Sequence, residues 1–473
     1  MKKLKTEKKP NVIFIVMDSL RAKNLSCYGY NRNTSPNIDS LANKGALFEK
    51  AFSTNNSTNP SFLSILSGRH VLKEDKNTFT YNKEEIKSFF DSGGTFLQEA
   101  LKKNGYKTYC LSYLLNWQKR GFDYFWKLNE EENEEENNKR NSYFYRIMKD
   151  LIYYISSRPK FSFLFSKKIK SEVKSEPIGE KATDDAIRII KENKKNNFFM
   201  RIDFDDTHTP YNAPGIFAKK FIAEEKGELL FKNLKKRNFN KRYQTILLSF
   251  FDRNIGINEM IAKYDSAISY NDYLIGKIIN TLREEELLDN TYIFLFSDHG
   301  ESLTEHNIFF CHSGLYDSVM NVPLIIYGPR IGKNKKISSL VQLEDLMPSV
   351  LDLLKIEYSN LMFDGESLLP LIDGKKDKIR DSVFMEEIYD IKRRGLRTDK
   401  YKYIEINNSK NDEEKKLHEL YDLKFDPYEN HNIASENNDL SLEMQEKMQN
   451  AIKELRNNNE KRRIKSLVLN RKI

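Results

Sequence analysis

Acids and histidines follow apolar runs at three places in the sequence. Asp18 ends the run NVIFIVMD, Asp206 and His208 follow FFMRIDF, and Asp298 and His299 follow YIFLFS. Because the carboxyl ends of strands in an open α/β sheet form the ligand-binding edge, we expect these side chains to converge. Carboxylates and imidazoles are common ligands of divalent metal ions. One Asp-His pair alone would more often be structural, but three such strand ends in one chain favour a metal site.

A hydroxyl-rich stretch, AFSTNNSTNPSFLSILSGRH at residues 51–70, is the place to look for a nucleophile. The Pro60-Ser61 step indicates the start of a helix, with proline in the first turn. A hydroxyl just before that helix would face its free N–H groups and the positive end of its dipole, where a phosphate or sulfate binds well. Taken alone, these hydroxyls are more simply interpreted as helix caps.

The bulk composition is that of a globular protein with a mild basic excess. The 473 residues include 78 Lys and Arg against 69 Asp and Glu, a net charge of +9 without a long basic block, so we expect no nucleic-acid partner. Three widely separated cysteines predict neither a disulfide framework nor a zinc site. The apolar run after the basic start is too short for a signal peptide, and no stretch reaches the ~20 apolar residues of a membrane span. These features predict a cytoplasmic protein.

Strand-like and helical stretches alternate through most of the chain, as in RIIKENKKNNFFMRIDF and LREEELLDNTYIFLF. This alternation predicts an α/β fold with a layered sheet. From about residue 376, short strands of antiparallel type and a polar-faced helix predict a smaller C-terminal α+β subdomain. We therefore expect a catalytic α/β domain at 1–375, with an insertion at about 129–180, and a C-terminal subdomain at 376–473.

The segment at 141–170 mixes aromatic residues with lysines. Such a composition could contact a membrane surface peripherally. Its apolar residues do not form a clean helical stripe, so a helical insertion packed near the site entrance is the favoured interpretation. Nothing in the sequence predicts an oligomeric state.

The order of motifs along residues 10–435 resembles the sulfatase family, within the alkaline phosphatase superfamily. NVIFIVMDSLRAKNLSCYGY resembles the family's opening strand and first metal-ligand loop, and DDTHTPY resembles its Asp-Pro-His-x-Pro-Tyr motif. The most specific stretch includes SDHGESLTEHNIFFCHSGLYDSVMNVPLIIYGP, and LYDLKFDPYENHNIA resembles the C-terminal subdomain. The resemblance implies a large mixed β-sheet sandwiched by helices, like that of alkaline phosphatase, with a smaller C-terminal α+β subdomain.

The resemblance also implies roles for individual residues. One divalent metal ion (Ca, Mg, Mn or Zn) would be held by four side chains: Asp18, Thr58, Asp298 and His299. Thr58 would also be the nucleophile, while His208 and His312 would bind the anionic oxygens of the substrate or protonate the leaving group. Asp206, His208 and His312 could hold a second metal ion, as in the two-zinc phosphodiesterases.

Residues 58–62 depart from the family motif Cys-x-Pro-Ser-Arg. The chain has TNPSF, so a threonine replaces the Cys or Ser that sulfatases oxidise to formylglycine, and the arginine is missing. Threonine cannot give that aldehyde. Ser19 stands where many sulfatases have a second Asp, which leaves the metal shell one carboxylate short, and the family's Gly-Lys-Trp-His segment has no counterpart after Tyr106.

These departures favour a metal-dependent hydrolase of phosphate esters or diesters over a strict sulfatase, because a threonine phosphate can be cleared by attack at phosphorus. The expected substrate is a small anionic ester or a glycan. Hydrolysis of sulfate esters by the unmodified threonine stays open at this point, and so do two other functions. A transferase could move a phospho-headgroup onto a glycan or lipid, and a degenerate sulfatase fold could serve as a non-catalytic binding protein.

Overall fold

A computed structural model describes most of the chain. The described residues are 9–70, 72, 83–112, 116–126, 178–211, 213–236, 251–252, 254–358, 361–387, 392–408 and 415–470. Nearly all of the insertion predicted at 129–180, including the segment at 141–170, lies outside them. Among the described residues, no helix combines the length and the apolar character needed to cross a membrane. The cytoplasmic location expected from the sequence stays a prediction.

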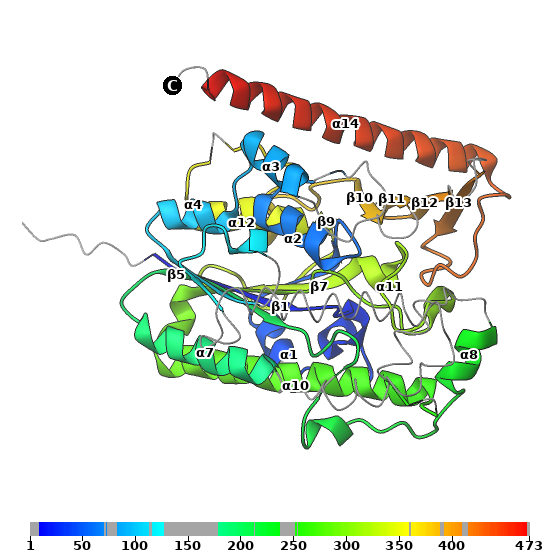
Figure 1. The fold of residues 1–473 in the computed structure, drawn as a ribbon, viewed down its shortest axis with the longest axis horizontal. Helices are drawn as coiled ribbons and strands as arrows, with labels where there is room; N and C mark the ends of the chain where they lie inside the picture. The colour runs from blue at the N-terminus through cyan, green and yellow to red at the C-terminus, as the bar shows by residue number, and fades with distance from the viewer. Residues whose placement is uncertain are drawn as a thin grey trace, which may run out of the picture.

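A nine-stranded mixed sheet forms the centre of the molecule (Figure 1). Its strands run in the order β4 (Tyr124–Phe125), β3 (Lys107–Leu111), β5 (Phe198–Phe204), β1 (Asn11–Met17), β6 (Thr291–Phe296), β7 (Asn321–Tyr327), β2 (Ala46–Phe52) and β8 (Lys335–Ile337), with β9 (Val341–Gln342) also pairing with β2. Strands β4, β3, β5, β1 and β6 are parallel, and β7 is antiparallel to both of its neighbours. The expected α/β fold with a large mixed sheet is confirmed.

The central strand β1 is buried along its whole length, because both faces of the sheet are covered. Its sequence NVIFIVM is a nearly continuous apolar run, which is typical of a parallel strand with helices on both sides. Ile13 and Ile15 point to one hydrophobic core, whereas Phe14 and Val16 point to the other.

Helices cover each face of this sheet (Figure 1). The core that contains Ile13 is closed by α1 (Pro36–Asn43), α7 (Ile178–Glu192), α8 (Leu230–Lys236) and α10 (Ile257–Glu284). The core that contains Phe14 is closed by α2 (Thr58–Ser67), α3 (Lys83–Asp91), α4 (Leu97–Lys103), α12 (Leu346–Leu353) and α13 (Leu369–Ile372). A short helix, α11 (Asp317–Met320), leads into β7.

A second, antiparallel sheet follows the main one in sequence. It contains β10 (Ser382–Glu387), β11 (Lys392–Thr398), β12 (Tyr401–Asn408) and β13 (Lys415–Asp422), in that order. The long helix α14 (Asn438–Asn470) runs along this sheet and past α3 (Figure 1). The expected C-terminal α+β portion is therefore present, and its boundary at 375/376 stays a prediction.

Candidate metal and nucleophile site

The ends of the three parallel strands β5, β1 and β6 are fastened to one another at the same level. The backbone N–H of Asp18 donates to the carbonyl of Phe204 at 2.8 Å, which ties β1 to β5. The hydroxyl of Ser297 lies 2.6 Å from the Met17 carbonyl oxygen, and that of Thr207 donates to the Asp18 carbonyl at 2.6 Å. These bonds hold the residues that follow each strand at a single edge of the sheet, as the sequence predicts.

Asp18, Asp298 and His299 form a compact cluster at this edge. One ligand atom from each residue lies within 4.8 Å of the others. His299 Nε2 is 3.7 Å from Asp18 Oδ1 and 3.6 Å from Asp298 Oδ2. The other ring nitrogen of His299, Nδ1, lies 2.9 Å from the carbonyl oxygen of Gly300, and a proton on Nδ1 would leave Nε2 free as a ligand.

The electrostatics of the cluster suit a divalent cation. Asp298 is fully buried, and its Oδ2 has no hydrogen-bond partner within the described part of the chain. Burial, with repulsion from Asp18 added, raises the pKa of Asp298 to about 6. Two carboxylates and one imidazole are also a chemically suitable donor set for such an ion. The residues present therefore fit a metal ion, which would remove the cost of burying two like charges side by side.

Ser19 and Glu301 lie next to the carboxylates. The Ser19 hydroxyl donates to Asp18 Oδ1 at 3.0 Å. At the position where the family pattern has a second Asp, this chain therefore has a serine that supports the first one. Glu301 is 2% exposed, and burial, reinforced by Asp18, raises its pKa well above the usual range. Protonation of Glu301, which the raised pKa favours, would leave the cluster without a further negative charge.

Thr58 is the first residue of α2 and faces the cluster. Its Oγ1 lies 3.3 Å from His299 Nε2. The turn that precedes α2 is tied to the end of β6, because Ser53 Oγ lies 2.6 Å from the carbonyl oxygen of Asp298 and 3.0 Å from Ser61 Oγ. The four residues expected to surround the metal ion, although far apart in the sequence, are thus together in space.

The two expected substrate-binding histidines lie beside the cluster. The ring centroid of His312 is 4.4 Å from that of His299 and 5.8 Å from that of His208. Burial lowers the pKa of His312 well below its usual range, and the neighbouring histidines lower it further. The backbone of His312 is held by Asn56, whose Nδ2 donates to its carbonyl at 2.8 Å.

Asp206 points away from these histidines. A Cβ built on Gly179 of α7 would lie 2.6 Å from Asp206 Oδ2, so this carboxylate lies in the layer between the sheet and α7. Burial raises the pKa of Asp206 to about 7. In the described part of the chain, the cluster of Asp18 and its two neighbours is the one group of three acids, histidines or cysteines with ligand atoms this close. The structure does not assemble Asp206 with His208 and His312 as a second metal site.

Sequence reasoning passed over two sets of polar residues near the site. Arg201 and Asp203 are buried on β5, beneath the first turn of α2. Their signal was two charges spaced two residues apart inside the apolar run FFMRIDF, which places both on one face of the strand. Glu387 of β10 accepts hydrogen bonds from the Ser313 hydroxyl at 2.9 Å and the Gly314 N–H at 3.1 Å. The second sheet therefore holds the loop that carries the last histidine of the site.

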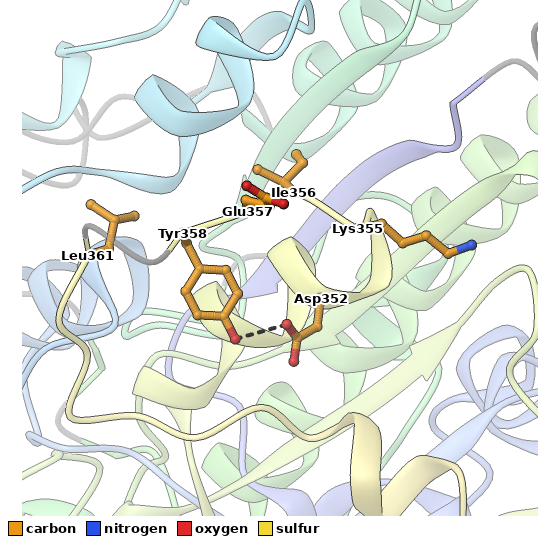
Figure 2. Close-up of a pocket in the computed structure, with 6 residues that line it drawn as sticks. All are labelled: Asp352, Lys355, Ile356, Glu357, Tyr358 and Leu361. Carbon is orange, nitrogen blue, oxygen red and sulfur yellow. Dashed lines mark hydrogen bonds between the residues drawn. The ribbon is translucent and has the colours of Figure 1, made fainter.

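A separate surface hollow follows α12, as Figure 2 shows. It has a cavity volume of about 450 Å³. Two of the residues that line the hollow are joined by a hydrogen bond: the hydroxyl of Tyr358 donates to Asp352 Oδ1 at 2.8 Å. Its lining residues belong to none of the elements that form the strand-end cluster, so this hollow is not the candidate site; they are Asp352, Lys355, Ile356, Glu357, Tyr358 and Leu361.

Comparison with known proteins agrees with this geometry. Residues 10–356 match the sulfatase family model, and residues 304–458 match the model of the C-terminal region of N-sulphoglucosamine sulphohydrolase. The uncharacterized sulfatase YidJ of Escherichia coli is 24% identical over 456 residues, covering 91% of this chain and 84% of its own length.

Two solved structures share the fold. BT1596, a 2-O GAG sulfatase, has a TM-score of 0.68 and 20% identity, and the match covers 95% of this chain and 93% of that one. The phosphonate monoester hydrolase of Agrobacterium radiobacter has a TM-score of 0.66 and 18% identity, with 95% and 96% covered. Because the sulfatase model spans most of the sequence and the strand-end cluster lies inside it, the chain belongs to the sulfatase family of hydrolases, within the alkaline phosphatase superfamily.

Proposed function

We propose that this protein is a metal-dependent hydrolase that cleaves phosphate esters, diesters above all, with Thr58 as its nucleophile. The observation that carries the proposal is the position of the Thr58 hydroxyl, 3.3 Å from His299 Nε2 at the edge of the carboxylate cluster. A metal ion bound there would lower the pKa of this hydroxyl and neutralise charge on the transferred group. Asp18, Asp298, His299 and Thr58 are the residues that would hold it.

The chemistry of threonine favours phosphorus over sulfur as the centre attacked. A formylglycine hydrate expels sulfate by collapsing to an aldehyde, and a threonine ester has no such exit. A threonine sulfate would have to be cleared by slow attack at sulfur, whereas a threonine phosphate can be cleared by attack of water at phosphorus. The fold is compatible with both kinds of ester, since it is shared by a sulfatase and by a phosphonate monoester hydrolase.

His208 and His312 have the other two roles in the proposed reaction, which are charge stabilisation and proton transfer. Thr58 Oγ1 gives up its proton to solvent and forms a bond to phosphorus, while the bond from phosphorus to the departing alkoxide, in line with it, breaks. His208 stabilises the charge that grows on the phosphoryl oxygens, an effect that is strong in a preorganised site. His312 is neutral in the free protein because its pKa is depressed, and the negative charge of a bound substrate would raise that pKa so that the ring can carry a proton to the leaving group. Such proton transfer typically contributes 10²–10⁴-fold to the rate.

The proposed substrate is a small anionic ester or a glycan ester. The 2-O GAG sulfatase BT1596 acts on a glycan and shares the fold over almost the whole chain, which supports the glycan class. No nucleic-acid partner is proposed, because the net charge of +9 is spread over 473 residues.

A panel of chromogenic esters tests the proposal. Aryl phosphate, bis-aryl phosphate, aryl phosphonate and aryl sulfate would be compared, each with Mg²⁺, Mn²⁺, Ca²⁺ and Zn²⁺. We expect the highest kcat/KM with a phosphate diester or phosphonate, and mass spectrometry of acid-quenched enzyme should detect a phosphoryl group on Thr58.

Sulfate-ester hydrolysis is the second candidate, favoured by the match to the sulfatase family model. Turnover of aryl sulfate faster than every phosphorus ester would establish it and overturn the phosphate proposal. A protein that binds no divalent ion and hydrolyses none of the four esters would instead be a non-catalytic member of the family.

A further inference from the structure

Arginine is rarely buried completely, yet Arg201 of β5 is 0% exposed and lies on the face of the sheet that α2 covers. Its charge is balanced by Asp203, two residues along the same strand and 4% exposed. Arg201 Nε donates to one carboxylate oxygen of Asp203 at 2.8 Å and Nη2 donates to the other at 2.5 Å. This bidentate pairing fixes the plane of the guanidinium group.

The same guanidinium also reaches the first turn of α2 by two routes. Its Nη1 donates to Gln118 Oε1 at 2.7 Å, and Gln118 Nε2 donates to Asn59 Oδ1 at 3.1 Å. Its Cζ lies 3.4 Å from the ring centroid of Phe62. Asn59 directly follows Thr58, and Phe62 lies one helical turn beyond it, so both contacts are made beside the proposed nucleophile.

Phe62 occupies the position at which the family motif has an arginine. Position 62 is where the motif Cys-x-Pro-Ser-Arg places its arginine, and this chain has phenylalanine there. A guanidinium nevertheless lies against this part of α2, supplied by β5 and stacked on the ring that replaces the motif arginine. A buried cation therefore lies beneath the nucleophile turn in this chain, although it comes from strand β5 and not from position 62 of helix α2.

We propose that Arg201, with Asp203 and Gln118, is a positioning residue that holds the first turn of α2 so that the Thr58 hydroxyl faces the metal cluster. This inference rests on the proposed function, because it assigns Arg201 a task only if Thr58 is the nucleophile. On the opposite side, the turn is fastened to β6 through Ser53, so loss of the β5 contacts would free one side of it. A displacement of about 1 Å at a reacting group can cost 10²-fold in rate.

The test uses a variant that removes both buried charges, Arg201→Met/Asp203→Leu, because replacing a whole ion pair by apolar residues is often tolerated. Gln118→Leu breaks the link to Asn59 alone and serves as a second variant. The matched control is Arg462→Met/Asp364→Leu, an equally buried pair with a 2.7 Å contact close to the opposite end of α2.

We expect kcat to fall 10–100-fold in Arg201→Met/Asp203→Leu with KM changed less than threefold, a smaller fall in kcat in Gln118→Leu, and none in the control. In the double variant Phe62→Arg/Arg201→Met, Asp203 remains and can pair with the new arginine. Its kcat should be at least tenfold higher than that of Arg201→Met alone. A folded Arg201→Met/Asp203→Leu protein with wild-type kcat, or a control that loses as much, would overturn the positioning role. If the folded Phe62→Arg/Arg201→Met protein shows no recovery of kcat, Arg201 does not take the place of the motif arginine.

A second readout needs no turnover. Mn²⁺ affinity would be measured by calorimetry for the wild type, Thr58→Val, Arg201→Met/Asp203→Leu and the combined variant. We expect the charge-pair variant to weaken Mn²⁺ binding several-fold when Thr58 is present and not at all in the Thr58→Val background. Equal weakening in both backgrounds, or none in either, would overturn the positioning role. Equal affinity of wild type and Thr58→Val would instead count against the proposed function.

Discussion

Two of the buried clusters of charged residues in this protein are balanced in opposite ways. At the end of β1 and β6, the carboxylates of Asp18 and Asp298 lie together, and the pKa of Asp298 is raised to about 6 by burial and by Asp18. At the junction with the second sheet, Lys402 is 0% exposed and contacts both Asp317 and Glu429, the latter at 2.5 Å. Burial and charge are common to both clusters, but among the described residues only the second pairs its carboxylates with lysine and arginine, whereas the first has the imidazole of His299 beside them.

This difference distinguishes a ligand-binding site from a group of structural ion pairs. In the second cluster, burial alone would raise the pKa of Asp317, but Lys402 and Arg397 outweigh it and hold that pKa well below its usual range. In the first, no lysine or arginine of the described residues forms an ion pair with Asp18 or Asp298, and burial raises the pKa of Asp298. Carboxylates buried together without a lysine or arginine are costly, so they indicate a cationic ligand that comes from outside the chain. The predictions below test whether the first cluster needs that ligand and the second does not.

The largest effect is expected from Thr58→Ala. Removal of the hydroxyl should lower kcat for the best ester by at least about 10³-fold, because the proposed nucleophile is lost, while the melting temperature changes little. Steady-state kinetics and circular dichroism check this. Thr58→Ser is the control, since it retains a hydroxyl and should keep measurable turnover. A Thr58→Ala protein with most of the wild-type rate would rule out the assigned nucleophile.

Lys402→Met should act on stability and leave metal binding intact. It leaves Asp317 and Glu429 with one counter-ion fewer in a buried place, and breaking a buried pair in this way costs about 3–5 kcal/mol. Urea unfolding measures the loss, and calorimetry should show an unchanged Mn²⁺ affinity. Lys50→Met is the matched control, because its ion pair with Asp399 is at the surface and contributes about 0–1 kcal/mol. A large loss of Mn²⁺ affinity in Lys402→Met would mean that the two clusters are coupled.

Metal binding itself should stabilise the fold through the first cluster. Mn²⁺ at 100 times its dissociation constant should add about 2.7 kcal/mol to the free energy of unfolding, and chelation should remove it. Asp298→Asn should abolish most of this gain and make the metal-free protein no less stable than the wild type, since a repulsion is relieved. Urea unfolding with and without Mn²⁺ compares the two proteins. Equal stabilisation of Asp298→Asn by Mn²⁺ would exclude this cluster as the metal site.

The smallest effect concerns Asp206, a buried acid that belongs to neither cluster. Its folded-state pKa is raised to about 7 by burial, above the value of about 3.9 in an unfolded chain. The folded protein therefore holds this proton more tightly, so stability falls as pH rises from about 4 to about 7. Asp206→Asn should remove this pH dependence and gain about 1–2 kcal/mol at pH 8, with little gain at pH 4. An equal gain at both pH values would contradict the raised pKa.

Much of the site could be predicted because its parts are encoded locally. The run NVIFIVM is apolar over seven positions, and an acid at the end of such a strand is visible in the sequence. The proline after Thr58 likewise indicated the start of α2 at the place where the structure has it. The order of these motifs was enough to identify the family, and the sulfatase family model matches the chain over residues 10–356.

The direction in which a side chain points and the residue that it contacts could not be predicted in the same way. Asp206 and His208 are two residues apart, yet the carboxylate points into the layer beneath α7 while the ring lies beside His312. Arg201 interrupts an apolar strand, and nothing in the local pattern says that its guanidinium lies on Phe62. Both facts depend on which helix covers which face of the sheet.

The sequence by itself determined the strands, the acids at their ends, the hydroxyl at the start of α2 and the family, because periodicity and short motifs are properties of neighbouring residues. Only the tertiary structure decided that β1 lies between β5 and β6, that the carboxylates of Asp18 and Asp298 meet beside His299, and that a cation from β5 lies under the nucleophile turn. Strand order joins residues hundreds of positions apart, and it is set by the packing of whole layers, which no short stretch of sequence contains.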